Sequence, residues 1–254
     1  MHISIIGSGN VAWHIAKASI VAKHVIDCVT SKTIANAQLF AQTYNTQYVE
    51  TIKKLPLNSD IYIIAVSDNA INDVLKDFPL QVNGIVVHTS GATDIEILSK
   101  QKQYGVLYPC QTLSKATEID YRNLPFFIEG NNESTLQKIE EFAKRISTNI
   151  SYANSIQRRK LHVAAVVASN FTNHLLLLAQ QYMTQNGLDF KMLKPLIEQT
   201  ISKALQTDPF SAQTGPARRH DTKTIDAHQK LIDDDNLLKI YQLLTNSIEK
   251  TYNK

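Results

Sequence analysis

A glycine-rich turn near the start of the chain has the residue types and the spacing of a pyrophosphate-binding site. Gly7-Ser8-Gly9-Asn10-Val11-Ala12 follows an apolar run and opens a helical pattern. In such a G-x-G-x-x-A turn the first glycine permits the bend, the second lets backbone N–H groups approach phosphate, and the small last residue lets the helix pack closely. The helix N-terminus adds partial positive charge. The turn predicts a bound dinucleotide, contacted by Gly7, Ser8, Gly9, Asn10 and Val11.

The residues after the second predicted strand bear on which dinucleotide binds. An NAD-binding domain commonly places Asp or Glu there to hold the ribose 2′-OH. Here residues 29–33 read Val-Thr-Ser-Lys-Thr, and Asp27 is expected inside the strand. Because Ser31 and Lys32 suit a 2′-phosphate, the sequence favours NADP over NAD. A solvated surface lysine is the alternative for Lys32.

Polar residues also follow two other predicted strands. Val66 and Ser67 come after one of them, and His88 and Ser90 end or follow the next. The carboxyl ends of parallel strands meet at one edge of a sheet, where ligands bind. We therefore expect all four residues beside the cofactor, with His88 or Ser90 contacting the nicotinamide or the substrate. The alternatives are helix capping for Ser67 and turn chemistry for Ser90.

A polar stripe on a largely apolar helix is the best candidate for the reacting centre. At roughly 100° per residue one narrow sector holds Arg158, His162, Ser169 and Asn173, with Asn170 just outside it. Buried polar groups need partners, so the stripe either makes hydrogen bonds between helices or faces the crevice. In the second case His162 is the predicted proton donor, since histidine titrates near neutrality. Ser169, Asn170 and Asn173 would then orient the substrate.

The loop at residues 215–221, Gly-Pro-Ala-Arg-Arg-His-Asp, is a second unusual feature of this half. Asp221 is a predicted N-cap for the following helix. Arg218 or Arg219 can clamp a carboxylate or phosphate with two parallel N–H groups, and we expect Arg219 to hold the anionic end of a substrate. A surface turn with solvated arginines is the alternative.

The elements that position these residues fall into two groups. Over residues 1–152 short β-branched runs alternate with helical patterns, whereas residues 153–254 carry long helical stretches only. Predicted strands are 3–6, 25–29, 61–66, 84–88, 106–108 and 126–128, with 48–49 weaker. Predicted helices are 10–23, 33–43, 69–77, 94–102, 134–147, 155–186, 190–207, 222–233 and 237–251. This pattern predicts an α/β fold, a Rossmann-type doubly wound parallel sheet followed by an all-helical C-terminal domain.

Composition limits the alternatives. A hydrophobic content of 43% with 19% charged residues is typical of an ordinary folded domain, and a net charge of +3 is too small for a dedicated nucleic-acid binder. The lone cysteines Cys28 and Cys110 argue against a metal site or a disulfide framework and fit a reducing cytoplasm. The first residues lack the pattern of a secretory signal. The apolar stretch 161–180 carries too many polar residues for a lone membrane helix, so we expect a second copy of the chain to cover it.

The chain resembles a bacterial family of oxidoreductases that join a Rossmann-like NADP-binding domain to a C-terminal helical domain of unknown function. More distantly it is similar to ketopantoate reductase, pyrroline-5-carboxylate reductase and the 6-phosphogluconate dehydrogenase-like superfamily. The motifs that carry the resemblance are Gly7–Ala12, residues 88–91, residues 108–112, the helix at 161–171, and the 214–221 loop. The family typically has glycine where this chain has His220. The lysine–asparagine pair of ketopantoate reductases is missing, because Ala164 stands four positions after Lys160.

Together these features predict an NADP-dependent oxidoreductase, a cytoplasmic homodimer that reduces a small carbonyl or imine bearing an acidic group. The cofactor carries the hydride chemistry, and the protein positions it. A non-catalytic NADP(H) sensor shares the glycine turn but needs no proton donor. Nucleic-acid binding through Arg158–Lys160 and Arg218–Arg219 would require those cations on one exposed face, which the polar stripe opposes.

Overall fold

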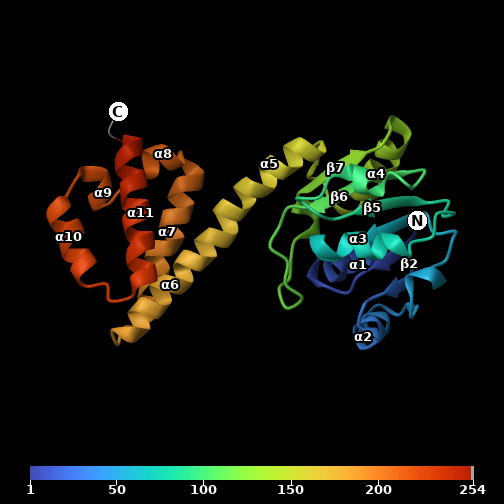
Figure 1. Ribbon diagram of the computed structural model, residues 1–254, viewed down its shortest axis with the longest axis horizontal. Coiled ribbons are helices and arrows are strands. Elements are labelled where there is room, and N and C mark those ends of the chain that lie inside the picture. The colour runs from blue at the N-terminus through green and yellow to red at the C-terminus, as the bar shows by residue number, and fades with distance from the viewer. Residues whose placement is uncertain (253–254) are drawn as a thin grey trace. The chain divides into compact units, whose positions relative to one another are not determined.

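A computed structural model describes residues 1–252, and contacts between residues divide the chain into a compact unit at 1–170 and another from Phe171 onward. The first unit holds one eight-stranded sheet in the order β3-β2-β1-β4-β5-β6-β7-β8. Its strands are β1 (His2–Ile6), β2 (Val25–Thr30), β3 (Gln47–Tyr48), β4 (Ile61–Ile64), β5 (Ile85–His88), β6 (Tyr104–Pro109), β7 (Phe126–Gly130) and β8 (Ile150–Tyr152). The predicted Rossmann-type sheet is confirmed (Figure 1).

Two features of the sheet were not predicted. β7 runs antiparallel to β6, because residues 110–125 return as a loop with one short 3₁₀ turn, Tyr121–Asn123, and not as a crossover helix. β8 is only three residues long and pairs in parallel with β7. Its sequence, Ile-Ser-Tyr, is too short to show a strand period by itself.

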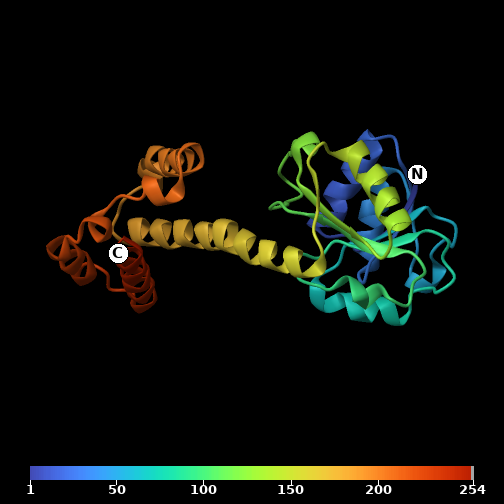
Figure 2. The ribbon, with the colours of Figure 1, turned by 90° about the horizontal axis from the view of Figure 1, so that it is seen from above.

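Helices cover both faces of the sheet (Figures 1 and 2). One face packs against α1 (Asn10–Val21), α2 (Ile34–Tyr44) and α4 (Glu133–Ile146), and the other against α3 (Asp68–Lys76) and a 3₁₀ turn at Ile95–Leu98. Successive residues of β4 alternate between the two cores, with Ile63 in one and Ile64 in the other. Burial of a whole isoleucine side chain stabilises the fold by about 1.5–3 kcal/mol. Because both faces of the central strands are buried, their sequences are continuous apolar runs.

The predicted helix at 94–102 is wrong. Only the 3₁₀ turn Ile95–Leu98 forms, and the Asp94 carboxylate accepts a hydrogen bond from the Glu96 N–H at 3.1 Å. The Gln101 N–H then bonds to the Leu98 carbonyl at 2.9 Å and turns the chain toward β6. Burial of Ile95 and Leu98 on the sheet therefore overrides the helical pattern of the sequence.

A continuous helical segment spans Ser155–Gln185, as predicted. It consists of α5 (Ser155–Ala165), a π-helical stretch (Val166–Phe171) and α6 (Thr172–Gln185). A capping box begins it, in which the Asn154 and Gln157 side chains each accept a hydrogen bond from the other residue's backbone N–H. It has 31 residues and an 18-residue stretch with a mean hydropathy of 1.4, so it is long and apolar enough to cross a membrane by length and composition alone.

The two compact units divide within this helical segment, between residues 170 and 171, whereas the boundary predicted from the sequence, 152/153, follows the last strand. The α/β elements do end with β8 at Tyr152. The start of α5 nevertheless belongs to the first unit, because the Arg158 guanidinium donates to the carboxylate of Glu129 in β7 and to the carbonyl of Thr93.

The second unit is helical throughout its described residues, as predicted. After α6 come a 3₁₀ turn (Phe190–Leu193), α7 (Lys194–Gln206), the short α8 (Pro209–Ala212) and α9 (Pro216–Arg219), α10 (Thr222–Lys230) and α11 (Asp235–Tyr252). Pro195 lies in the first turn of α7, where its missing N–H removes no helical hydrogen bond. α9 packs against both α10 and α11.

Candidate nucleotide-binding and catalytic site

The turn between β1 and α1 has the backbone geometry that the predicted phosphate site needs. Gly7 has φ 115°, and a Cβ there would lie 2.2 Å from the Ala65 carbonyl oxygen, so only glycine fits. A Cβ on Gly9, by contrast, would have no atom within 4 Å. Gly9 is the N-cap of α1 and no side chain caps this helix, which leaves its first N–H groups available to an anion.

A pocket of about 500 Å³ opens beside this turn, at the carboxyl ends of β1, β2 and β4. Its lining includes Gly7, Ser31, Lys32 and Val66. The Ser8 and Ser31 hydroxyls lie 2.8 Å apart and connect the phosphate turn to the end of β2. The predicted cofactor residues from β1, β2 and β4 therefore meet around one cavity.

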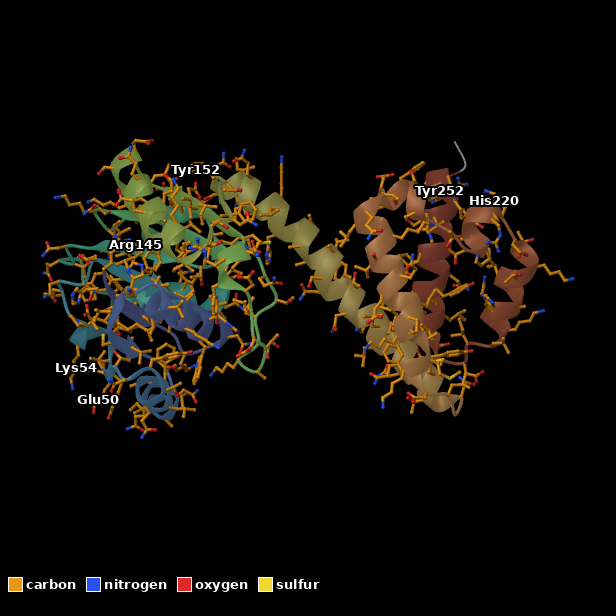
Figure 3. The ribbon with its side chains drawn as sticks, turned by 180° about the vertical axis from the view of Figure 1, so that it is seen from behind. Glu50, Lys54, Arg145, Tyr152, His220 and Tyr252 are labelled. Atoms are coloured by element: carbon orange, nitrogen blue, oxygen red, sulfur yellow. The ribbon has the colours of Figure 1, made fainter. Side chains whose placement is uncertain are left out.

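The carboxylates of this pocket have lysine partners other than Lys32. Three carboxylates also line the pocket, and each is paired with a lysine of its own: Glu50 with Lys54 at 2.8 Å, Asp73 with Lys76 at 2.6 Å, and Asp77 with Lys53 at 3.1 Å (Figure 3 labels the first pair). Lys54 and Lys76 hold the pKa values of Glu50 and Asp73 below their ordinary values, and the Lys32 charge adds to the lowering at Asp73. Within residues 1–252 no carboxylate lies within 4 Å of the Lys32 amine.

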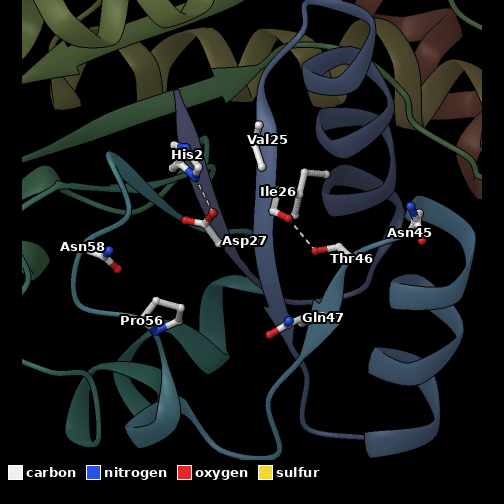
Figure 4. A pocket seen from close by; sticks show the side chains of 9 residues that line it. All are labelled: His2, Val25, Ile26, Asp27, Asn45, Thr46, Gln47, Pro56 and Asn58. Atoms are coloured by element: carbon white, nitrogen blue, oxygen red, sulfur yellow. Dashed lines mark hydrogen bonds and ion pairs between the residues drawn. The ribbon is translucent and has the colours of Figure 1, made fainter.

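Asp27 lies within β2 and is used elsewhere, as the sequence suggested. Its carboxylate pairs with the His2 imidazole at 2.6 Å and accepts a hydrogen bond from the Ser59 hydroxyl at 2.5 Å. These groups border a polar pocket of about 670 Å³ near the amino end of β2, opposite the end that carries Ser31 (Figure 4). Asp27 is therefore no candidate for holding a ribose in the phosphate-side pocket.

His88 does not have the position that its predicted ligand contact requires. Its side chain is completely buried at the end of β5, and burial together with the Arg158 charge lowers its pKa to about 3. Nδ1 accepts a hydrogen bond from the Ser90 N–H at 3.2 Å. His88 is thus a neutral core histidine, and the predicted contact with nicotinamide or substrate is corrected to a structural role.

Ser90 stabilises the turn after β5. Its hydroxyl oxygen accepts hydrogen bonds from the N–H groups of Ala92 at 3.1 Å and Thr93 at 2.9 Å, and it lies 2.9 Å from the Thr93 hydroxyl. Turn chemistry, the alternative open at the sequence level, describes this side chain. Ser67 is the N-cap residue of α3 and is exposed, but its side chain makes no capping hydrogen bond.

His162 lies beside the same edge of the sheet. Its Nδ1 is 3.2 Å from the hydroxyl of Tyr108, which stands near the end of β6, and the two rings meet edge to face. A Cβ on Gly91 would lie 2.6 Å from His162 Nδ1 and 2.8 Å from Tyr108 Cζ. The turn after β5, the end of β6 and helix α5 thus bring a half-buried imidazole to the carboxyl edge of the sheet, inside the first unit.

Arg158, one helical turn before His162, is fully buried. It donates to the Glu129 carboxylate, to the Thr93 carbonyl oxygen at 2.5 Å and to the Ser155 hydroxyl at 3.2 Å. The Ser155 hydroxyl itself donates to Glu129 at 2.9 Å. This network fixes the start of α5 on the sheet, so Arg158 is a structural anchor of the predicted proton donor and not a ligand-binding cation.

The remaining predicted site residues are spread along the helical part of the chain. Ser169 and Asn170 lie in the π-helical stretch of the first unit, and Asn173 and Arg219 belong to the second unit. The wider π turns change the rotation per residue. The single sector was calculated for a regular α-helix and does not allow for this stretch, so the roles of Ser169, Asn170, Asn173 and Arg219 stay predictions.

The 215–221 loop is ordered by contacts within the second unit. Arg218 lies over the Tyr252 ring at 4.3 Å, while Arg219 is exposed. Asp221 caps α10 as predicted, accepting a hydrogen bond from the Thr224 N–H at 3.1 Å. His220 has φ 56°, a left-handed conformation that favours glycine (Figure 3 labels His220 and Tyr252).

Comparison with known proteins identifies the family. Residues 1–110 match the model of a Rossmann-like domain, and residues 124–248 match a domain of unknown function, DUF2520. A Bacteroides fragilis protein described as an NADP oxidoreductase is 32% identical, with 98% of each chain covered and a TM-score of 0.90. The chain belongs to this Rossmann–DUF2520 family. The family resemblance inferred from the sequence motifs is thereby confirmed.

More distant solved structures share the fold. A pyrroline-5-carboxylate reductase from Coxiella burnetii is 18% identical over 99% of this chain and 97% of its own, with a TM-score of 0.58. A reductive aminase from Aspergillus terreus, solved with NADPH and ethyl levulinate, is 13% identical over 98% and 94%, with a TM-score of 0.74. Among curated proteins none matches the chain.

Two residues of the candidate site were given no role from the sequence. Tyr108 and Gly91 belong to the motifs that carry the family resemblance, but neither residue type by itself indicates proton chemistry. Their positions held the available signal, because both lie at or just beyond the carboxyl end of a strand, where Rossmann-type sheets bind ligands.

Proposed function

We propose that this chain is an NADP-dependent oxidoreductase that reduces a small carbonyl or imine substrate bearing an acidic group. The observation that carries the proposal is the pocket beside the Gly7 turn, whose rim offers Ser31, Lys32 and the uncapped N-terminus of α1. The solved relatives described as NADP oxidoreductases or bound to NADPH support the same cofactor.

The residues present fit this cofactor. Gly7 lets the chain pass against Ala65, and the open space at Gly9 admits a pyrophosphate to the α1 N–H groups. Ser31 and Lys32 would bind the 2′-phosphate. When bound, NADPH supplies the hydride for the reduction.

The protein's own task is to place a proton on the substrate atom that gains negative charge. We propose that His162 donates this proton to the developing alkoxide or amine, since it is half-buried beside the end of β6. Ser169 and Asn170, which belong to the same unit as His162, are proposed to orient the substrate. Substrate contacts by Asn173 and Arg219 stay predictions from the sequence.

The cofactor choice is tested by fluorescence of Trp13, the single tryptophan of the chain, which lies in the first turn of α1. NADPH binding is expected to quench it. Lys32→Ala should weaken NADPH binding about tenfold, the lower end for a charge-assisted hydrogen bond at an exposed site, and leave NADH binding unchanged. Lys100→Ala, an exposed lysine outside the pocket, serves as the control. Equal affinity for NADPH and NADH in the wild type would refute the preference.

Catalysis is tested by NADPH oxidation at 340 nm with a panel of keto acids and cyclic imines. We expect turnover with at least one anionic substrate and a loss of about 10²–10⁴-fold in His162→Ala. Retention of activity within threefold would remove His162 from this role. NADPH binding without turnover of any panel member would favour a sensor that reports cofactor occupancy to a partner.

We further propose that the protein works as a soluble homodimer in the cytoplasm. The Ser155–Gln185 segment leaves large apolar side chains in solvent, with Val163 64% and Val167 55% exposed. A second copy of the same helix would cover such a stripe. Light scattering after size-exclusion chromatography should give twice the 28.5 kDa chain mass, and Val163→Lys should shift the protein toward monomer.

A further inference from the structure

We propose that Tyr108 is a positioning residue for His162, whose hydroxyl holds Nδ1 and leaves Nε2 as the nitrogen that exchanges a proton with the substrate. The inference rests on the proposed reductase function and names the reacting atom of its proton donor. The observation behind it is the pairing of these two side chains at the carboxyl edge of the sheet.

The contact fixes both the position and the plane of the imidazole. Tyr108 Oη lies 3.2 Å from His162 Nδ1, and the ring centroids are 6.0 Å apart with an interplanar angle of 75°. Tyr108 is only 8% exposed, so water competes little for its hydroxyl. Because the second ring nitrogen takes no part in this contact, the pair gives the two nitrogens different functions.

The phenol keeps its proton at neutral pH. Burial raises the pKa of Tyr108, the neighbouring Cys110 and Asp68 raise it further, and the more distant Arg158 charge acts in the opposite direction. The Nδ1–H of an imidazolium donates to the phenol oxygen, and once Nε2 has given its proton to the substrate the neutral ring keeps Nδ1–H and the same hydrogen bond. Tyr108 can therefore stay bonded to His162 before and after Nε2 gives up its proton.

The surroundings keep this pair from moving apart. Gly91 packs directly against both rings, where a Cβ would come within 2.8 Å of each. Thr93, in the same turn, accepts a hydrogen bond from Arg158, which lies one helical turn before His162. The turn at residues 91–93 therefore both packs against the two rings and holds the start of α5 in place.

The structure favours a positioning role for Tyr108 over direct proton donation. Its raised pKa makes the phenol a poor acid at neutral pH, and its small exposure leaves little surface for a substrate. His162 is the more exposed member of the pair.

The test compares Tyr108→Phe with Tyr104→Phe in the full-length protein. Tyr104 is the matched control, since it lies on the same strand, is 9% exposed and directs its hydroxyl to Glu96 at 3.3 Å. Tyr108→Phe should lower kcat about 2- to 12-fold, as expected for one neutral hydrogen bond, with KM within twofold. Tyr104→Phe should leave both unchanged. Unfolding midpoints of both variants show that they fold.

A double-mutant cycle separates positioning from a general structural effect. In a His162→Ala background Tyr108→Phe should cause no further loss of kcat, because the hydroxyl acts only through the imidazole. An equal loss in both backgrounds would overturn the proposal, as would full kcat in Tyr108→Phe.

A second readout needs no substrate. Nitrogen-15 NMR of the neutral His162 ring should show the proton on Nδ1, bonded to Tyr108 Oη, in the wild type and in Tyr104→Phe, and a mixture of tautomers in Tyr108→Phe. Identical tautomers in all three proteins would refute the pairing, whatever the activity. Full activity of His162→Ala would instead refute His162 as the proton donor, and Nε2 as the reacting nitrogen, even where NMR confirms the hydrogen bond. Absence of turnover in the wild type would refute the proposed reductase function and leave the hydrogen bond in place.

Discussion

Gly91→Ala is the perturbation that probes the His162 site most directly. The new methyl carbon would lie 2.6 Å from His162 Nδ1 and 2.8 Å from Tyr108 Cζ, whereas ordinary contacts begin near 3.4 Å. Relieving the first contact requires a shift of about 0.8 Å, the difference between 3.4 and 2.6 Å. Neither ring is a flexible chain end, because the two are bonded to each other and α5 is fixed by Arg158.

Two costs follow from this clash. Overpacking of this kind destabilises a protein by about 1–3 kcal/mol, which urea unfolding measures. A displacement approaching 1 Å at a reacting group costs up to about 10²-fold in rate, so kcat for NADPH oxidation should fall by about 10- to 100-fold. Trp13 quenching by NADPH should keep its wild-type midpoint, because Gly91 lies outside the cofactor pocket.

Gly9→Ala is the matched control with the opposite outcome. Its Cβ would have no atom within 4 Å, so the stability should stay within about 0.5 kcal/mol of the wild type. The methyl group would occupy the space proposed for the pyrophosphate, so NADPH affinity should fall. A Gly91→Ala protein with wild-type stability and wild-type kcat would show that this reasoning about the His162–Tyr108 pair is wrong.

Three further predictions concern stability and are read from urea unfolding. His220→Gly should stabilise the protein by about 0.5–1 kcal/mol. The left-handed backbone costs a non-glycine residue about 1–2 kcal/mol, but glycine gives the unfolded chain more conformational entropy, which offsets part of the gain. His220→Ala should not raise the stability. Arg158→Met should cost about 3–5 kcal/mol by leaving Glu129 unpaired, whereas Arg159→Met, which breaks only an exposed pair, should stay within about 1 kcal/mol. Burial lowers the pKa of His24 from 6.5 to about 4. As the pH falls from about 6.5 to about 4, the unfolded chain therefore binds a proton at His24 before the folded protein does, and the free energy of unfolding decreases. His24→Gln should reduce this pH dependence of the free energy of unfolding by up to about 1.4 kcal/mol per pH unit.

Much of the cofactor half of the site followed from local sequence alone. A short apolar run, two glycines and a small residue determine a strand, a tight turn and a closely packed helix, and these depend on neighbours only a few residues away. The same holds for the Asn154 and Asp221 caps, where the side chain bonds to a backbone N–H three residues later. Such contacts can be predicted because the chain itself brings the partners together.

The reacting half depended on long-range contacts that no local pattern encodes. His88 and His162 are equivalent candidates in the sequence, yet β5 buries the first completely, while α5 brings the second to Tyr108, 54 residues away. Arg158 looked like part of a ligand-facing stripe until Glu129, from β7, accounted for its charge. The π-helical stretch Val166–Phe171 likewise departs from the regular helix for which the sector was calculated.

The sequence by itself therefore determined the Rossmann-type sheet, the helical second half and the glycine turn after β1, because each of these follows from residues close together in the chain. Only the tertiary structure decided which histidine is accessible, which polar groups are already paired, and that Tyr108 stands behind the proposed proton donor. The physical reason is burial. Whether a polar side chain is free to do chemistry depends on the partners and the solvent around it in the folded protein, and these come from segments far apart in the sequence.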